Sequence, residues 1–297
     1  MKNNEDALHF KYLIRSEQDV SWGLTIDSVG FQHIERNARY PSGNHPTRYL
    51  FSKKKGRVLD EFQLLYIVKG RGRFVSKSQQ QIDIREGQMF LLYPHEWHNY
   101  YPEENTGWDE YWVGFRGVNM DKRVENSFFK IEKPIYNIGI QEDVVQLYKL
   151  ALVVAKEQKT GYQQMLAGIV NLLLGYAYAY DKESSFENLQ VINQINKAKI
   201  IIGENLEFGI SPKNVAEKVH MSYSWFRHVF KQYTGFTPMQ YLQELRINKS
   251  KELLTNSSMM IKEIAFEVGF SKPEYFHAVF KEKTGYTPDK YRKFTQG

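Results

Sequence analysis

The sequence of 297 residues contains no cysteine. Disulfides, thiolate metal sites, iron–sulfur clusters and cysteine nucleophiles are therefore excluded for any fold. Long apolar runs are also missing, because the most apolar stretch, residues 166–180, is interrupted by glycine, asparagine and tyrosines, whereas a bilayer span needs about 20 apolar residues. The first six residues are polar and mixed in charge, unlike a secretory signal. These absences predict a cytoplasmic protein without a membrane span.

Positive charge is in slight excess and lies at one end of the chain. The net charge is +6 with histidines neutral, and the sequence pI is near 9.1. Residues 1–189 hold 24 basic and 24 acidic residues, whereas residues 190–297 hold 16 and 10. A neutral region joined to a basic one is typical of a protein whose basic part binds a polyanion, most often nucleic acid. An ordinary lysine-rich soluble surface is the alternative explanation of the charge.

The spacing of apolar residues predicts an N-terminal β domain followed by helices. Up to about residue 117, short apolar runs alternate with glycine and proline, as in an all-β sandwich or barrel. From residue 141, apolar residues recur at three- and four-residue steps with a break at residues 158–161, which predicts a helical hairpin. The expected strands are residues 62–68, 82–84, 89–93 and 111–115, with a turn at residues 69–72.

An internal repeat occupies the basic region. Residues 226–241 match residues 276–291 at an offset of 50, and nine of the sixteen positions are identical. Chance does not produce this agreement at a single offset, so the region is built from two copies of one unit. The identical pairs are Phe226/Phe276, Val229/Val279, Phe230/Phe280, Lys231/Lys281, Thr234/Thr284, Gly235/Gly285, Thr237/Thr287, Pro238/Pro288 and Tyr241/Tyr291.

Each copy is expected to form two short helices joined by a tight turn. In the first copy, Ser211 offers an N-cap before Pro212, and Ser222 can cap a second helix that ends at a left-handed Gly235. This arrangement is a helix-turn-helix, whose second helix enters the DNA major groove. A connecting helix over residues 239–254 would set the two recognition helices about 34 Å apart, one DNA turn. Their expected buried stripes are Trp225, Phe226, Val229 and Phe230, and Tyr275, Phe276, Val279 and Phe280.

The second copy resembles the signature of the AraC/XylS family of bacterial transcription regulators. The resemblance covers roughly residues 190–297 and implies an all-α domain with two helix-turn-helix motifs that binds double-stranded DNA. A helical domain that binds protein or RNA is the alternative. The resemblance rests on Ala265-Phe266-Glu267-Val268-Gly269-Phe270-Ser271, Tyr275-Phe276, Phe280-Lys281, Thr284-Gly285, Thr287-Pro288 and Tyr291-Arg292.

Side chains of the recognition helices outside the apolar stripes are the candidate DNA contacts. Arg227 is the best candidate for base readout, because a guanidinium can bond bidentately to guanine O6 and N7. Glu274 can accept from cytosine N4, and lysines suit phosphates. Ser222 is expected to act more as an N-cap than as a DNA contact. His277 is either a DNA contact or a solvent-exposed helix residue. The candidates are Ser222, Tyr223, Ser224, Arg227, His228 and Lys231 in the first helix, and Lys272, Glu274, His277 and Lys281 in the second.

The first half resembles the cupin-like barrel of sugar-responsive AraC-type regulators. Together with the helical region, this implies an α+β chain divided into a barrel (residues 1–139), a dimerisation hairpin (140–180), a linker (181–190) and a DNA-binding domain (191–297). A homodimer is expected, and RNA polymerase is a further candidate partner. The resemblance rests on residues 66–72, Glu86-Gly87, Tyr93-Pro94, His98, Tyr100, Trp108, Trp112, Phe115 and Gly117.

Cupins often bind metals, but this sequence lacks the pattern for it. His45, His95 and His98 are scattered, and residues 62–68 bring no histidine or acid to the barrel. We therefore expect no metal, no cofactor and no enzymatic activity. The rival hypotheses are a metal-dependent cupin enzyme with a DNA-binding tail, and a regulator whose barrel binds a protein.

An organic effector fits the barrel residues better. Strand alternation places Trp108, Glu110, Trp112 and Gly114 on one face of residues 108–115. A buried glutamate beside an aromatic ring suits a carbohydrate, which offers hydroxyls to the carboxylate and a C–H face to the ring. The alternative is that Trp112 and Tyr100 simply fill the barrel. With the resemblance, the candidate effector-binding residues are Arg57, His98, Tyr100, Glu110 and Trp112.

Overall fold

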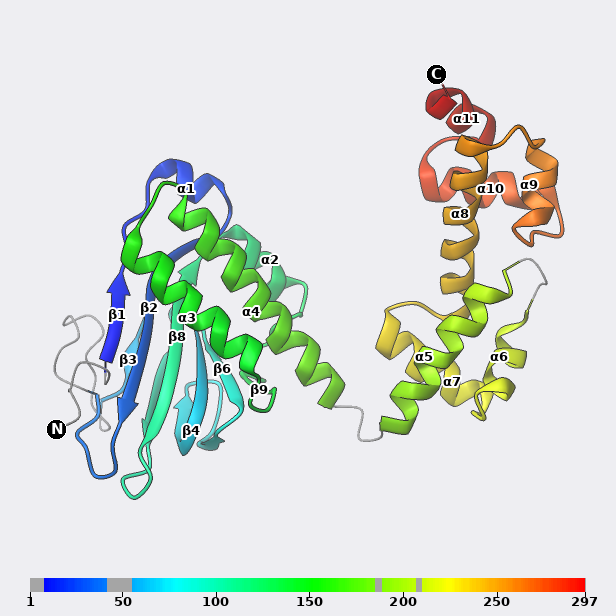
Figure 1. The fold of residues 1–297 in the computed structure, drawn as a ribbon. Coiled ribbons are helices and arrows are strands. Elements are labelled where there is room, and N and C mark those ends of the chain that lie inside the picture. Colours follow the sequence, from blue (N-terminus) through cyan, green and yellow to red (C-terminus); the bar gives the residue numbers. More distant parts are fainter. Residues whose placement is uncertain (1–7, 42–54, 185–188, 207–209, 297) are drawn as a thin grey trace. The chain divides into compact units, whose positions relative to one another are not determined.

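The computed structural model describes residues 8–41, 55–184, 189–206 and 210–296, which form two compact units divided between Ser185 and Phe186 (Figure 1). The first unit is an antiparallel sheet structure with helices on one face, and the second is helical. The predicted α+β class is therefore confirmed. Within the described ranges, no helix combines the length and apolar content needed to cross a bilayer.

Every strand pairing among the described residues of the first unit is antiparallel, as in a jelly roll. The main path of the sheet runs β1-β2-β8-β4-β6-β9, while β3 pairs with β7, and β5 and β7 pair with β4. The strands are β1 (Leu8–Tyr12), β2 (Thr25–Ile34), β3 (Arg57–Val58), β4 (Phe62–Ser76), β5 (Ile82–Arg85), β6 (Gln88–Leu92), β7 (Trp97–Pro102), β8 (Trp108–Arg116) and β9 (Ile135–Asn137).

The turn predicted at residues 69–72 is wrong, because β4 continues through it to Ser76. The first part of β4 pairs with β6 and β8, and the last part pairs with β5 and β7. The register with β8 shifts between Ile67 and Lys69, and Gly70 adopts a left-handed φ of 84°. Glycine at a bulge lets the strand bend and pass from one sheet to the other instead of turning back.

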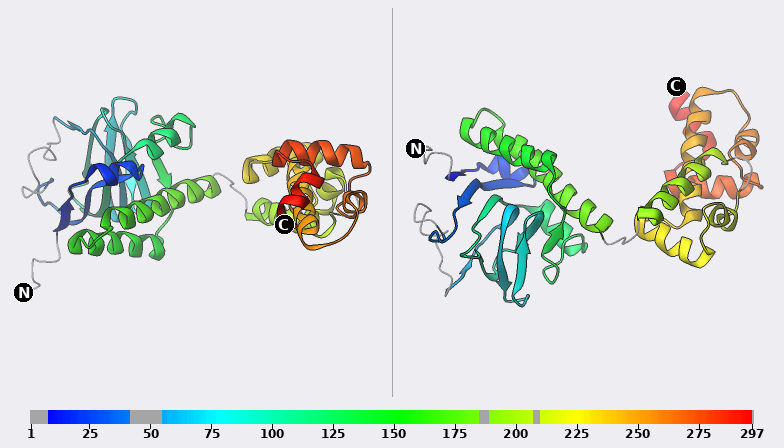
Figure 2. Two further views of the ribbon diagram at one scale, coloured as in Figure 1. Left: turned by 90° about the horizontal axis from the view of Figure 1, so that it is seen from above. Right: turned by 60° about the horizontal axis from the view of Figure 1, so that its bottom comes forward.

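Helices α3 (Glu142–Glu157) and α4 (Tyr162–Ser184) form the predicted hairpin and lie side by side on one face of the sheet (Figures 1 and 2). α3 ends at Gln158, whose φ of 45° is left-handed. Tyr148 and Leu166 are among the hairpin residues fully buried against β-strand side chains such as Tyr66. Two short helices, α1 (Glu17–Ser21) and α2 (Val118–Glu125), flank this layer. α4 runs to Ser184, and residues 185–188 of the predicted linker lie outside the described residues.

The second unit consists of two helical groups that share α8 (Figure 1). One apolar core contains Phe226, Phe230 and Leu242, and the other contains Phe276 and Phe280. α8 contributes to both cores, so the repeat is one long helix with a helix-turn-helix at each end. The helices are α5 (Leu189–Glu204), α6 (Pro212–Lys218), α7 (Tyr223–Thr234), α8 (Pro238–Asn256), α9 (Ile261–Glu267), α10 (Pro273–Thr284) and α11 (Pro288–Gln296).

Capping of the first motif follows the sequence at two of three predicted positions. The Ser211 hydroxyl accepts from the Asn214 N–H at 3.1 Å, and Gly235 ends α7 with a φ of 82°. Ser222 occupies the N-cap of α7, but its hydroxyl makes no capping hydrogen bond. Ser222 therefore occupies the predicted N-cap position but does not make the predicted capping hydrogen bond.

Candidate ligand site and DNA interface

The two faces of β8 contact different parts of the sensor unit. Tyr111, Val113 and Phe115 pack in the core beneath the helical hairpin, whereas Trp108 and Trp112 belong to a separate cluster on the opposite, inner face of the barrel. This division follows the alternation predicted for the strand. The inner cluster consists of Ile34, Tyr40, Leu65, Ile67, Phe74, Ile84, Phe90, Leu92, Tyr100, Trp108 and Trp112.

Trp112 fits inside the barrel because glycine stands opposite it. Gly30 of β2 is the register partner of Trp112, and a Cβ built on Gly30 would lie 1.9 Å from Cζ2 of the indole. Any side chain at residue 30 would therefore displace the ring. The indole is 6% exposed and forms part of the inner wall.

Glu110 is an almost fully buried carboxylic acid on this inner face. It is 3% exposed, and the Tyr40 hydroxyl donates to its two oxygens at 3.1 and 3.3 Å. Burial raises the pKa of Glu110 to about 8, although the Tyr40 hydrogen bond and the nearby Arg57 act in the opposite direction. The carboxyl group is therefore mainly protonated near pH 7 and can form hydrogen bonds with a ligand.

Arg57 brings a positive charge to the same face. Its Nη2 donates to the Tyr100 hydroxyl at 2.7 Å and to Oε1 of Gln63 at 3.1 Å, and its Nε donates to Nε2 of His98 at 3.2 Å. His98 Nδ1 lies 3.0 Å from the Glu96 carbonyl oxygen and donates to it, which sets the neutral tautomer. Burial, reinforced by Arg57, lowers the pKa of His98 to about 3.

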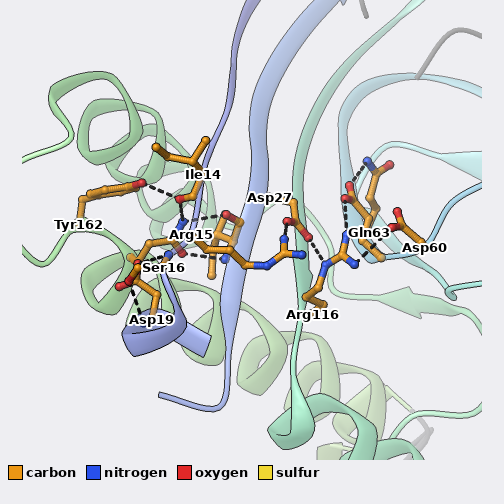
Figure 3. A network of polar contacts seen from close by, with 12 residues as sticks. Ile14, Arg15, Ser16, Asp19, Asp27, Asp60, Gln63, Arg116 and Tyr162 are labelled. Atoms are coloured by element: carbon orange, nitrogen blue, oxygen red, sulfur yellow. Dashed lines mark hydrogen bonds and ion pairs between the residues drawn. The ribbon is translucent and has the colours of Figure 1, made fainter. Parts of the chain in front are cut away.

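Gln63, a hydrogen-bond partner of Arg57, begins a chain of polar contacts that leads through Arg116 toward the N-terminal segment of the unit (Figure 3). Gln63 Nε2 donates to the fully buried Glu61 at 3.1 Å, and Nη2 of Arg116 lies 3.6 Å from Glu61. Arg116 also donates through Nε to Asp27 at 2.7 Å, and Asp27 pairs with Arg15. Acids and bases alternate along this chain, which compensates the cost of burying them.

The N-terminal segment is in turn held by the start of α4. Gln163, which is buried, donates to the carbonyl oxygens of Ile14 and Ile26 at 3.0 Å each and accepts from the Ile26 N–H at 2.9 Å. The Tyr162 hydroxyl donates to the Ile14 carbonyl at 2.7 Å (Figure 3). Polar contacts therefore connect the inner face of the barrel with the helical hairpin.

The structure brings all five candidate effector residues to the inner face, and it adds residues that sequence reasoning missed. The sequence around Tyr40 does not indicate a site residue, because its partner Glu110 lies 70 residues further along the chain. Gln63 had a signal, since it is the polar member of an otherwise apolar inward face of β4. His95 is exposed at a turn and His45 lies outside the described residues. Among the described residues, no three His, Asp or Glu side chains cluster as metal ligands would.

In the second unit, the candidate DNA contacts of the first motif are all exposed on α7 and its N-cap. Phe226, Val229 and Phe230 fill the core on the opposite side. Arg227 has no ion-pair partner within the part of the chain that the structure describes, so its guanidinium is available. The exposed residues are Ser222, Tyr223, Ser224, Arg227, His228 and Lys231.

The predicted burial of Trp225 and Tyr275 is wrong, since each is 52% exposed. Each precedes the first buried phenylalanine by one residue, and one helical residue turns the side chain by about 100°, off the buried stripe. The Trp225 ring stacks on His228 with 6.0 Å between centroids. The Tyr275 hydroxyl accepts from Gln243 of α8 at 2.9 Å.

The second recognition helix, α10, presents fewer hydrogen-bonding groups. Lys272 stands at its N-cap, Glu274 lies in its first turn and Lys281 lies near its C-terminus, all exposed. His277, which is half-buried, occupies the position of Arg227 in the repeat. The arrangement favours base readout by the first motif and backbone contact by the second.

Comparison with protein-family models matches both units. Residues 40–162 match the AraC-like ligand binding domain, and residues 215–293 match a helix-turn-helix domain. Together these matches span more than half of the chain and fall on the barrel with its hairpin and on the duplicated motif.

Curated relatives match across nearly the whole chain. The Msm operon regulatory protein of Streptococcus mutans is 25% identical over 95% of this chain and 98% of the relative. The raffinose operon transcriptional regulatory protein of Pediococcus pentosaceus is 23% identical over 82% of this chain and 88% of the relative. The lactose operon transcription activator of Staphylococcus xylosus is 23% identical over 79% and 85%.

The barrel and the duplicated helix-turn-helix thus define a DNA-binding transcriptional regulator with a ligand-binding domain. The chain belongs to the AraC family of transcriptional regulators, and the relatives that match it over most of its length are regulators and not enzymes.

Proposed function

We propose that this regulator binds a carbohydrate on the inner face of its barrel and that the bound sugar changes its action on DNA. The observation that carries the proposal is the buried Glu110 beside Trp112. Its raised pKa makes Glu110 mainly a neutral carboxylic acid near pH 7, which accepts from the Tyr40 hydroxyl and has an O–H of its own to donate. Sugar hydroxyls both donate and accept, so they suit such a group.

The groups around Glu110 suit a neutral polyhydroxylated ligand. Arg57 and the Tyr100 hydroxyl supply donors near the acidic acceptor, while indole and phenol rings supply flat apolar surface. A purely apolar ligand would gain no hydrogen bonds from these polar groups. The names of relatives that regulate raffinose and lactose operons support a sugar and guide the choice of test compounds.

The helical hairpin is the proposed dimer contact. Leu150, Val153, Met165 and Leu172 are each about half exposed on α3 and α4. Exposed apolar side chains gathered on one hairpin are typical of a surface that another molecule covers. A second copy of this chain would bury them and present two DNA-binding units to paired half-sites.

The polar chain from Arg57 through Arg116 to the start of α4 is the proposed route from sugar to hairpin. A ligand that competes for Arg57 would weaken its hydrogen bond to Gln63, and the Glu61–Arg116–Asp27 contacts would readjust. Coupling of this kind requires only that the ligand favour one arrangement over the other.

Thermal shift and calorimetric titration of the full-length protein test the sugar proposal. Lactose, raffinose, glucose, galactose and their sugar acids form the panel, and a ligand at 100 times its Kd raises stability by about 2.7 kcal/mol. Glu110→Gln should abolish the shift produced by the sugar that binds. A panel without any stabilising sugar, combined with stoichiometric iron, manganese or zinc in the purified protein, would favour the metal-enzyme hypothesis instead.

A further inference from the structure

Two side chains at equivalent positions of the repeat, one in each copy, donate to backbone carbonyls at equivalent places. Arg246 of α8 and Gln296 of α11 lie 50 residues apart. Nη2 and Nε of Arg246 donate to the Leu206 carbonyl at 2.9 and 3.2 Å, just after the end of α5. Nε2 of Gln296 lies 3.0–3.2 Å from three carbonyl oxygens at the end of α8. Both side chains donate to backbone carbonyls at or just beyond the C-terminal end of a helix, where intrahelical donors are lacking.

Arg246 differs from Gln296 because it also touches the other copy. Its guanidinium carbon lies 5.6 Å from the centroid of the Phe270 ring. Phe270 is 3% exposed and belongs to the core of the second motif. A half-buried guanidinium over an aromatic ring gains a cation–π interaction in addition to its hydrogen bonds.

The turn of the second motif lies directly against this contact. Gly269, between α9 and α10, has a φ of 87°. A Cβ at this residue would lie 2.2 Å from the Leu206 carbonyl oxygen and 2.6 Å from Nη2 of Arg246. Only a glycine therefore allows the turn of the second motif to pack on Leu206 and Arg246.

One side chain thus joins the edges of two separate apolar cores. Leu206 packs against the first core and Phe270 lies within the second, while the guanidinium of Arg246 contacts both. Two further polar contacts of this part of α8, Gln243 with Tyr275 and Glu244 with Lys283, join α8 to α10. They orient the second motif on α8, whereas Arg246 contacts both Leu206 and Phe270.

We propose that Arg246 is the positioning residue that holds the second helix-turn-helix in a fixed orientation relative to the first. It thereby determines the spacing between the two DNA segments that the domain binds together. The recognition helices must meet two groove segments in register, and one inserted base pair rotates the second segment by about 34°. A rigid domain discriminates against the wrong spacing, whereas a loosened one loses both this discrimination and part of its affinity.

The test measures the affinity of full-length protein for a duplex selected from a random library, and for the same duplex with one base pair inserted or removed between the two protected segments. Wild type should bind the altered duplexes about 100-fold more weakly. Arg246→Gln and Arg246→Ala should bind the selected duplex about tenfold more weakly, as expected for loss of a charge-assisted contact. Their spacing penalty should fall below about tenfold.

Arg246→Gln introduces the residue that the second copy uses at this position, so it retains a donor for the Leu206 carbonyl and loses the cation over Phe270. The matched control is Gln296→Ala, which removes the equivalent loop closure but should keep the wild-type spacing penalty. Folding is checked by circular dichroism. If Arg246→Ala does not fold, Arg246→Gln decides the question. A folded Arg246→Gln protein with the wild-type spacing penalty would overturn the proposal.

Discussion

The two units of this regulator differ in where they keep their ionisable groups. The sensor unit buries Asp27, Glu61, His98 and Glu110, each at most 6% exposed. In the DNA-binding unit, across residues 189–206 and 210–296, no ionisable side chain is buried to this degree. Burial of a charge is costly unless partners compensate it.

The difference indicates two kinds of binding surface. The helical unit has an apolar interior and directs its basic side chains outward, where they meet a large, hydrated polyanion. The barrel directs acid and base inward, where the proposed carbohydrate would meet them. The following experiments test this contrast, beginning with the largest expected effect.

Truncation of a core aromatic should affect the helical unit alone. Phe226→Ala removes a fully buried ring and should destabilise that unit by about 3–5 kcal/mol, because a cavity adds to the lost burial. Trp225→Ala, at an exposed neighbouring position, should cost less than about 0.5 kcal/mol. Calorimetry should show a lowered transition for Phe226→Ala beside an unchanged transition of the barrel. Equal effects of the two variants would contradict the burial described here.

Removal of the buried acid should change how the stability of the barrel depends on pH. The pKa of Glu110 is raised to about 8 when folded, above its ordinary value of 4.5. The unfolded chain loses this proton first, so stability is full below pH 4.5 and is lost as the pH rises through 8. Glu110→Gln should therefore flatten this decline, which amounts to about 1–4 kcal/mol. Urea unfolding of the ligand-free protein between pH 5 and 9 measures it.

His98 gives the opposite slope at acid pH and serves as an internal control. Its folded pKa of about 3 lies below the ordinary value of 6.5, so stability is present above pH 6.5 and is lost as the pH falls toward 3. Glu110→Gln should leave the part of this limb below pH 4.5 unchanged, because Glu110 is protonated there in both the folded and the unfolded chain; urea unfolding between pH 3 and 4.5 measures it. A variant that alters both limbs equally would indicate a general loss of structure.

Loss of an exposed arginine should affect DNA binding without affecting folding. Arg227→Ala should weaken binding to the preferred site by about 1–3 kcal/mol and relax the base preference at one position, as expected for a bidentate guanine contact. His277→Ala, the equivalent change in the second motif, should have a smaller effect. Gel-shift titration measures both. If Arg227→Ala had the DNA affinity and base preference of the wild type, Arg227 would not read a base.

The smallest contrast concerns two helix caps of the first motif. Ser211→Ala loses an observed capping hydrogen bond and should cost about 1 kcal/mol of stability. Ser222→Ala has no such bond to lose and should change stability by less than about 0.5 kcal/mol. Thermal unfolding compares the two. An equal loss of stability in both variants would show that the Ser222 side chain caps α7 in solution. A loss of DNA affinity in Ser222→Ala alone would identify Ser222 as a DNA contact.

Much of the architecture was predictable because it depends on local periodicity. The hairpin, the alternation along β8 and the cap at Ser211 each arise from residues a few positions apart, and the repeat is visible as one local pattern that occurs twice. The exposed Trp225 was mispredicted because aromatic character was taken as a sign of burial, although the helical angle excludes it from the stripe. The continuation of β4 through Gly70 was mispredicted because a glycine that permits a bulge has the same sequence signal as one that permits a turn.

Contacts between distant residues could not be predicted in this way. Tyr40 meets Glu110, Arg57 meets Tyr100, and Arg246 meets Leu206 and Phe270 across separations that periodicity does not constrain. The sequence by itself determined a duplicated DNA-binding unit beside a neutral barrel, since repeats, charge and periodicity are local properties. The tertiary structure alone decided which buried acid faces which base and which side chain joins the two motifs, because these pairings follow from how the strands and helices pack.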